Sequence, residues 1–381
     1  MNTELTTFDF ETRSRVNIKT EGLARYAHDP STSVLCAAYI LPGETSPIIW
    51  TPNDPIPDFR NAVLGAWNAS FERQIWQHVL KWPEPKGWYD IAAHSRYAGA
   101  PGKLQTASEW FGLGDKGKSA RGEFLIKTLC IPLVTGFKKH KVNKGDFCND
   151  PTLLNELYDY CKQDCVAEKT ILELLPPWPQ LEQDIWKMTL DQNERGCPID
   201  VDLCNAVVTL TEQMLSKAQD IIFDATGGKV VSPTQTAAVK TWLNTQGVNV
   251  NDVNKETVAQ IVKQYEDAKD TKNPIFQVLK ARQVGAPASI KKFRSALGKH
   301  VGGRLYHQFI YCGGGATGRW SGGGKDEDSD SVQLQNLRRG KQSEEMLDVI
   351  KMADADILSA VSADPIKELQ NSVRSLLYSA V

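Results

Sequence analysis

Two carboxylates alternate along a short β-prone run near the start of the chain. Asp9 and Glu11 stand in the sequence Phe8-Asp9-Phe10-Glu11-Thr12. Side chains at i and i+2 of a strand leave the same face, so the two carboxylates would project together, about 7 Å apart along one side. Paired carboxylates suit a divalent cation that prefers oxygen ligands. The triplet alone has a competing interpretation, because a D-x-E pattern on a strand is usually a solvated surface.

Two further fragments could contribute to the same chemistry. Tyr160 and Asp164 stand four residues apart in a helical stretch, a spacing that directs a phenol and a carboxylate to one spot. Asn68 and Glu72 follow a β-prone run, at what reads as a strand-to-helix turn. Each fragment also has an ordinary interpretation, such as a core tyrosine with an exposed acid one turn later. The order and separation of all three fragments carry the inference.

The first half of the chain has the pattern of a mixed α/β domain that could hold these groups. β-prone runs occupy residues 5–10, 34–40, 48–50 and 62–67, and helical spacing occupies residues 71–80 and 153–174. Three prolines in residues 176–179 then interrupt any helix and indicate a linker. Beyond it the pattern is mostly helical, over residues 181–194, 201–223, 232–243, 256–268 and 275–297. Residues 305–311 are strand-like, and residues 313–324 form a glycine-dense loop.

The composition is that of an ordinary globular protein. With 381 residues, 41% of them apolar and 24% charged, the chain has room for two or three domains of ~150 residues each. No apolar run approaches the ~20 residues of a membrane helix, and the N-terminus has no secretion signal. The eight cysteines include no C-x-x-C pair. This argues against a zinc ribbon or a disulfide scaffold and favours reduced thiols in a cytoplasmic chain.

Charge is unevenly distributed along the chain. The formal net charge of −2 excludes a uniformly basic nucleic-acid binder. Residues 271–325 nevertheless carry ten Lys or Arg and no Asp or Glu, and an acidic run follows at residues 325–330. A polyanion partner is the simplest reason for such a basic block. The alternative is a solvated basic face whose acids are supplied by a neighbouring domain.

Taken in order, the three acidic fragments resemble the motifs of the tyrosine-containing DEDD superfamily of proofreading 3′–5′ exonucleases. These motifs are D-x-E near the N-terminus, N-x-x-[FY]-[DE] some sixty residues later, and Y-x-x-x-D near the end of the domain. Residues 90–114 are similar to the segment found between them in phage and prophage polymerases of family A. The likeness covers residues 1–175 and implies an α/β ribonuclease H-like domain, a mixed sheet flanked by helices.

The resemblance also implies a two-metal hydrolysis of the 3′-terminal phosphodiester. The catalytic residues carried over by motif position are Asp9, Glu11, Glu72, Tyr160 and Asp164. The four carboxylates would bind two Mg²⁺ ions, for which Mn²⁺ can substitute. Tyr160 would orient the attacking water. Glu72 departs from the family's usual aspartate by one methylene, and Asn68 would shape the turn before it.

Part of the second half resembles the segment that precedes the catalytic motifs of family A DNA polymerases. T-G-R-W-S at residues 317–321 and Q-N-L at residues 335–337 carry this likeness, and residues 232–235, 279–282 and 290–293 look like the family's thumb. The glycine-dense loop is no Walker A, and on glycine content alone it would be a flexible linker. The two likenesses imply DNA contacts from Asn68, Lys291, Lys292, Arg294, Thr317, Arg319, Gln335 and Asn336.

The two resemblances together predict the organisation of the whole chain. Residues 1–175 would be the exonuclease domain and residues 176–180 a Pro-rich linker. Residues 181–300 would be a mostly α-helical thumb-like region, and residues 301–381 a partial polymerase palm. The D-Y-S-x-I-E, finger and H-D-E motifs of a family A polymerase are absent from the sequence. We therefore expect no nucleotide incorporation by this chain alone, and interpret the acids of residues 326–330 as solvated.

The expected function is the Mg²⁺-dependent proofreading exonuclease portion of a phage-type family A DNA polymerase. Its partners would be a single-stranded or frayed 3′ end and primer–template duplex. A second chain with the remaining motifs would be a further partner if the polymerase is split. One alternative is a non-catalytic DNA-binding subunit that grips duplex through the basic block. The other alternative is a ribonuclease of the DEDD superfamily, against which the T-G-R-W-S and Q-N-L segments count.

Overall fold

The computed structural model describes residues 5–114, 120–137, 140–284, 290–322, 332–340 and 342–377. The chain forms two compact units. The first comprises Met1–Cys197 and Gly298–Gln335, and the second comprises Pro198–Leu297 and Asn336–Val381. The acidic run at residues 325–330 lies outside the described residues. The functional division into exonuclease, linker, thumb and palm stays a prediction.

A five-stranded mixed sheet forms the centre of the first unit. Its strand order is β3 (Ile48–Trp50), β2 (Ser33–Ile40), β1 (Leu5–Arg13), β4 (Val63–Ala66) and β5 (Gly87–Asp90). Strand β1 pairs with β2 antiparallel and with β4 parallel, so it is the central strand. The first four strands lie where the sequence predicts them. Strand β5 was not predicted, because its four residues show no clear alternation.

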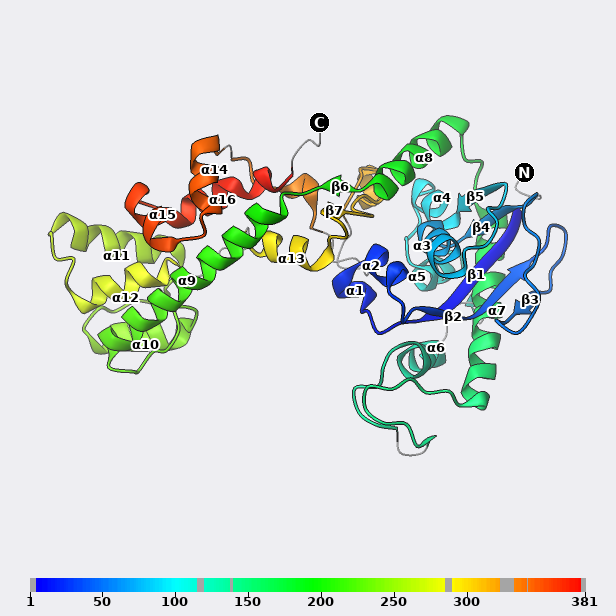
Figure 1. Cartoon of the computed structure of the whole chain (residues 1–381), viewed down its shortest axis with the longest axis horizontal. Helices are drawn as coiled ribbons and strands as arrows, with labels where there is room; N and C mark the ends of the chain where they lie inside the picture. Colours follow the sequence, from blue (N-terminus) through cyan, green and yellow to red (C-terminus); the bar gives the residue numbers. More distant parts are fainter. Residues whose placement is uncertain are drawn as a thin grey trace. The chain divides into compact units, whose positions relative to one another are not determined.

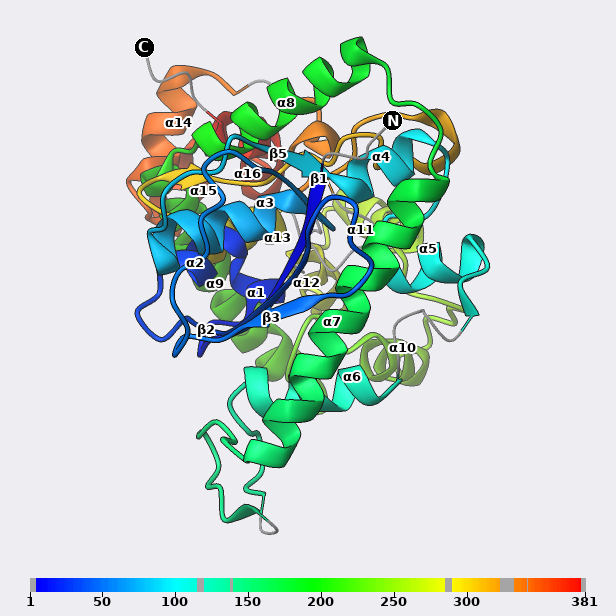
Figure 2. The ribbon, with the colours of Figure 1, turned by 90° about the vertical axis from the view of Figure 1, so that its right-hand side faces the viewer.

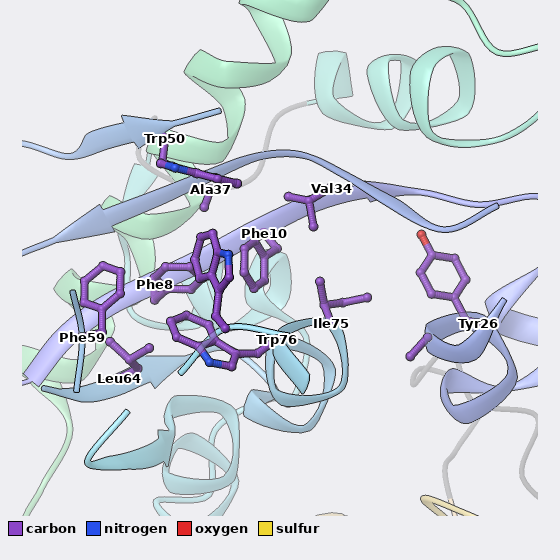
Figure 3. Close-up of a cluster of buried hydrophobic side chains, with 12 residues drawn as sticks. Phe8, Phe10, Tyr26, Val34, Ala37, Trp50, Phe59, Leu64, Ile75 and Trp76 are labelled. Atoms are coloured by element: carbon purple, nitrogen blue, oxygen red, sulfur yellow. The ribbon is translucent and has the colours of Figure 1, made fainter. Parts of the chain in front are cut away.

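The two faces of β1 carry different chemistry. Phe8 and Phe10 point into an apolar cluster, where Figure 3 shows them beside Ile75 and Trp76. The ring of Phe8 meets those of Phe10 and Trp76 edge to face, with centroids 4.6 and 5.6 Å apart. The intervening residues point to the opposite face, which α7 (Pro151–Leu174) crosses alongside β1 and β2 (Figure 2). Alternation on one strand thus separates the core from the acids.

Helices cover both faces of this sheet, as Figure 1 shows. Their bounds are α1 (Ile18–Glu21), α2 (Leu23–His28), α3 (Ala69–Gln74), α4 (Ile91–Tyr97), α5 (Leu104–Trp110), α6 (Ala120–Leu125), α7 and α8 (Gln180–Arg195), with π-helical turns η1 (Ile75–Leu80) and η3 (Ile126–Cys130). The structure therefore confirms a mixed sheet flanked by helices. The predicted helix over residues 71–80 is divided between α3 and η1.

The proline-rich segment interrupts the helices as predicted, since α7 ends at Leu174 and α8 begins at Gln180. The segment also packs into the core of the first unit. Trp178 is buried and stacks on His94, with ring centroids 5.1 Å apart. His94 Nε2–H donates to the carbonyl of Pro176 at 2.7 Å, and Tyr89 Oη lies 2.8 Å from Nδ1. The segment is therefore anchored to α4 rather than solvated.

The predicted strand at residues 305–311 is largely wrong. Strand β7 spans only Arg304–Leu305, and beyond it Ile310 forms an isolated bridge with Ser321. His307 and Cys312 have φ values of 54° and 50°, and such backbone is incompatible with an extended strand. The loop between the bridged residues is closed by Gly314 N–H, which donates to the Arg319 carbonyl at 2.8 Å. A defined loop therefore occupies this stretch.

The second unit is mostly helical, as predicted. Its helices include α9 (Val201–Thr226), α10 (Thr236–Thr245), α11 (Lys255–Asp267), α12 (Pro274–Arg282), α14 (Glu344–Lys351), α15 (Ala355–Val361) and α16 (Pro365–Asn371). The side chains of α9 to α12 share one apolar cluster around Trp242 and Leu243. The predicted helix over residues 275–297 is divided between α12 and α13 (Lys291–Lys299). Among the described residues, no helix has the length and apolar character needed to cross a membrane.

Candidate metal centre on the central strand

Three of the predicted acids meet at one place in the first unit. Asp9 and Glu11 on β1 and Asp164 on α7 each offer a carboxylate oxygen, and these oxygens lie within 4.8 Å of one another. Glu11 and Asp164 are buried and Asp9 is partly buried. Three carboxylates at this spacing repel one another unless cations or protons neutralise them. The oxygen-only donor set fits a hard divalent cation such as Mg²⁺.

Helix α7 is held close to β1 by small side chains. Asp150 caps its N-terminus by accepting hydrogen bonds from the backbone of Thr152 and Leu153. One face of the helix then packs Cys161 and Cys165 against β2. Cys161 Sγ lies 3.3 Å from Asp9 Oδ2, as a donor to that carboxylate. Thiols in place of bulkier groups let the helix approach the strand, and so bring Asp164 to the two acids of β1.

Tyr160 lies beside this acidic group, as its spacing from Asp164 predicts. The side chain is 4% exposed and packs with Leu125, Leu129 and Leu157. Burial raises the pKa of Tyr160 above its usual value, and the charge of Asp164 raises it further. The phenol therefore keeps its proton at neutral pH. In that state it can donate a hydrogen bond but cannot serve as a base.

The ring of Tyr160 lies directly on Gly122 of α6. A Cβ atom at position 122 would be 2.7 Å from Cδ2 and Cζ of the ring, and closer still to Cε2. Real Cβ atoms essentially never approach so closely, so only glycine fits here without a shift. The glycine is needed for space and has no positive φ. Helix α6 thus forms the wall against which the phenol is placed.

Glu72 is buried near the three acids without joining them. It lies in the first turn of α3, is 3% exposed, and its Oε2 has no hydrogen-bond partner among the described residues. Burial raises its pKa well above 4.5, and the charge of Asp9 raises it further. The turn before it is shaped by Asn68, whose φ of 68° is left-handed. Asp90 braces this turn, since its carboxylate interacts with the backbone N–H groups of Asn68 and Ala69.

Sequence reasoning missed a fifth acid at this site. Glu168 on α7 is fully buried. Neither of its carboxyl oxygens makes a hydrogen bond of normal geometry with a described residue. The backbone of Trp67 interacts with the carboxylate more weakly. Burial raises its pKa well above 4.5, and the charges of Asp9 and Glu72 raise it further. The available signal was spacing, because Glu168 stands one turn after Asp164, on the same face of the helix.

The predicted DNA-binding residues are mostly exposed, and among them Asn68 lies at the turn that precedes Glu72. Exposed side chains are those of Asn68, Lys291, Arg294, Thr317, Arg319, Gln335 and Asn336, and Lys292 is partly buried. Arg294 pairs with Glu212 at 2.9 Å, and Lys280 of the same basic block pairs with Glu266 at 3.0 Å. Acids of the same unit therefore neutralise part of the block, and in these two pairs they do not come from a neighbouring domain. The contacts of these residues with DNA stay predictions.

Comparison with known proteins identifies a relative. No protein-family profile matches the chain. The DNA polymerase of Bacillus phage SP02 is 27% identical over an alignment of 354 positions, and the alignment covers 87% of this chain and 51% of the phage protein. The chain thus spans about half the length of this curated relative.

A solved structure was also matched. It is the POL domain of Pol1 from M. smegmatis in complex with DNA primer-template and dNTP, with a TM-score of 0.45 and 13% identity, over 89% of this chain and 52% of that one. The sequence relationship is the stronger of the two. Along most of its length the chain is a relative of a phage DNA polymerase, which confirms the resemblance to phage-type family A DNA polymerases.

Proposed function

We propose that the first unit contains a ribonuclease H-like 3′–5′ exonuclease domain that trims the 3′ end of DNA. The observation that carries this proposal is the convergence of Asp9, Glu11 and Asp164 within 4.8 Å, with Tyr160 beside them. The relationship to a phage DNA polymerase makes DNA the substrate to test first. Proofreading is the role that such an activity would have in a polymerase.

In this proposal the carboxylates hold the cations and the phenol holds the water. Asp9, Glu11 and Asp164 would form the first Mg²⁺ site, and Glu72 would complete a second with Asp9. When bound, the two ions would acidify a water and neutralise the leaving 3′ oxygen. Water adds to the terminal phosphorus and the P–O3′ bond breaks, which releases a nucleoside 5′-monophosphate and a shortened 3′-hydroxyl end.

Tyr160 would orient the water without accepting its proton. Its raised pKa keeps the hydroxyl protonated, and its packing against Gly122 and three leucines fixes the ring. A held ring gives the hydroxyl one position, which favours a single line of approach to phosphorus. Loss of the hydroxyl alone should therefore slow hydrolysis without weakening metal binding.

The proposal is tested by degradation of 5′-labelled single-stranded DNA in Mg²⁺. Asp9→Asn and Asp164→Asn should each abolish the shortening of the strand. Asp159→Asn is the matched control, because Asp159 is exposed on the same helix and pairs with Lys162 at the surface. Wild-type rates in either active-site variant would refute the site assignment. A wild-type protein that binds DNA but never shortens it would support the non-catalytic alternative.

The same assay separates a deoxyribonuclease from a ribonuclease. An RNA strand of matched sequence should be trimmed more slowly than DNA, and the opposite order would favour the DEDD ribonuclease. Extension of a primed template with labelled dNTPs tests the polymerase prediction. We expect no extension by this chain alone.

A further inference from the structure

A hollow of about 600 Å³ lies at the end of β1, outside the acidic centre. The side chains of Arg13, Arg15 and Lys141 line it, together with the ring of Phe147. Two acids, Asp146 and Asp150, also contribute. None of these residues has a part in the proposed chemistry. The hollow therefore needs a separate explanation.

The positive charges in the hollow are held in place. Arg13 Nη1 donates to Asn149 Oδ1 at 2.6 Å, and Arg15 Nη1 donates to the carbonyl of Gly145 at 2.8 Å. Both guanidinium groups lie over the ring of Phe147, at 5.2 and 5.4 Å from its centroid. Each guanidinium has five N–H donors, so both retain donors for an anion. Fixed cations lose little conformational entropy when they bind a ligand.

Of the two acids, one is already engaged within the protein. Asp150 Oδ2 lies 2.7 Å from His140 Nδ1, and Oδ1 caps helix α7. Asp150 keeps its charge but directs it at the helix terminus and His140, so the lining has three basic side chains against two acids. Pro151 has no N–H group, and Asp150 accepts from those of Thr152 and Leu153, so α7 contributes to the hollow only the positive end of its dipole. The balance of charge favours an anionic ligand.

The position of the hollow relative to the acids limits what that anion is. Arg13 follows Glu11 by two residues on β1, or about 7 Å. Pro151 precedes Tyr160 by nine residues on α7, or about 14 Å. At a stacked rise of ~3.4 Å per nucleotide, the hollow lies roughly two to four nucleotides from the acidic centre. An exonuclease leaves one nucleotide on the 3′ side of the bond it cuts, so DNA at this distance must lie on the 5′ side.

We propose that this hollow binds the strand being trimmed, two to four nucleotides on the 5′ side of the cleaved bond. Arg13 and Arg15 bind a backbone phosphate, and Phe147 with Val142 offers apolar contact to a base. The inference rests on the proposed exonuclease function, because that function gives the strand its direction. It predicts that the site distinguishes oligonucleotides by length.

The test measures DNA binding and hydrolysis separately. Anisotropy of a labelled single-stranded 12-mer, recorded in EDTA, reports binding without cleavage. Arg15→Ala removes an exposed side chain. It should lower the affinity for the 12-mer about tenfold and reduce the slope of log affinity against log salt concentration by about 0.7. Phe147→Leu should lower the affinity for the 12-mer by a smaller factor and leave the salt slope unchanged. Lys86→Ala, which removes the same charge from an exposed site in this unit, should match wild type.

Substrate length provides the second measurement. With Mg²⁺, Arg15→Ala should raise KM for an eight-nucleotide strand about tenfold and leave a dinucleotide unchanged. Equal binding of the 12-mer by wild type and Arg15→Ala would overturn this inference, even if the protein hydrolyses DNA. An equal loss of affinity in Lys86→Ala would also overturn it, because the loss would then reflect the net charge of the protein and not the hollow. If the wild-type protein does not hydrolyse DNA but Arg15→Ala still loses DNA binding, the proposed function is refuted. The hollow would then remain a DNA-binding site.

Discussion

The contact between Gly122 and Tyr160 gives the most direct test of how the phenol is positioned. Gly122→Ala adds one methyl group, whose carbon would lie 2.7 Å from two carbons of the ring and closer to a third. Carbon atoms in contact are normally 3.5–4.0 Å apart. The ring or α6 must therefore move by about 1 Å. The ring is enclosed by Leu125, Leu129 and Leu157, so it has little room to move without disturbing the hydroxyl.

Two opposing effects set the change in stability. Inserting a methyl group into a packed core costs about 1–3 kcal/mol. Alanine in a helix is favoured over glycine by about 1 kcal/mol. The net loss should therefore be about 0–2 kcal/mol, small enough for the variant to stay folded. The effect on catalysis should be larger, because a 1 Å misplacement of a positioning group can cost about 100-fold in rate.

The assay compares Gly122→Ala with Gly298→Ala, a helical glycine whose Cβ would meet no atom within 4 Å. Only the first should lower kcat on single-stranded DNA, and neither should alter Mn²⁺ affinity. In a Tyr160→Ala background the ring is gone, so Gly122→Ala should no longer slow hydrolysis and should stabilise the protein by up to about 1 kcal/mol. A wild-type kcat for Gly122→Ala would refute the positioning argument. So would an undiminished effect in the Tyr160→Ala background.

The other predictions concern charge and capping. Glu168→Gln should stabilise the metal-free protein at pH 8, because burial holds the pKa of Glu168 well above 4.5 and the charged form is costly in the folded state. Thermal unfolding in EDTA measures this stability. An unchanged melting temperature would mean that the carboxyl group is paired. Burial lowers the pKa of His94 to about 4 from 6.5, so the unfolded chain binds the proton first, and stability should fall as the pH drops from 6.5 toward 4. His94→Gln should show a shallower fall in melting temperature over that range, and a parallel one would contradict the assignment. Asp200 caps α9 and pairs with Lys351 at 2.7 Å, so Asp200→Ala should cost about 1–2 kcal/mol in urea unfolding. Asp202→Ala, at an exposed acid in the same first turn that is not the cap, should cost less, about 0.3–1 kcal/mol.

The acidic centre was predictable from sequence because its parts obey local periodicities. A period of two places Asp9 and Glu11 on one face of β1, and a period near four places Tyr160 beside Asp164 on α7. Neither period indicates which face of the helix meets the strand. That choice depends on Cys161 and Cys165, whose small side chains pack against β2. Sequence reasoning therefore identified the acids and Tyr160 but not the packing of α7 on β2 that brings them together.

The failures have physical causes of a different kind. The strand expected over residues 305–311 was inferred from β-prone side chains, but left-handed backbone at His307 ends it. The basic block suggested a polyanion partner from its charge count, yet Lys280 and Arg294 pair with acids distant in sequence. Glu168 was missed because an acid one turn from another on a helix is ordinarily a surface pair. The last two errors concern tertiary neighbours that sequence spacing does not reveal.

The buried acids also link metal binding to protons. Asp9, Glu11 and Asp164 form the group that offers ligand oxygens together, whereas Glu72 and Glu168 lie beside it with pKa values well above 4.5. In the proposed mechanism Glu72 must lose its proton to hold the second cation. A cation that binds there neutralises the charge of Asp9, which is part of what keeps the proton on Glu72. In this proposal metal affinity at this position would rise with pH, because Glu72 would bind the cation only after it loses its proton.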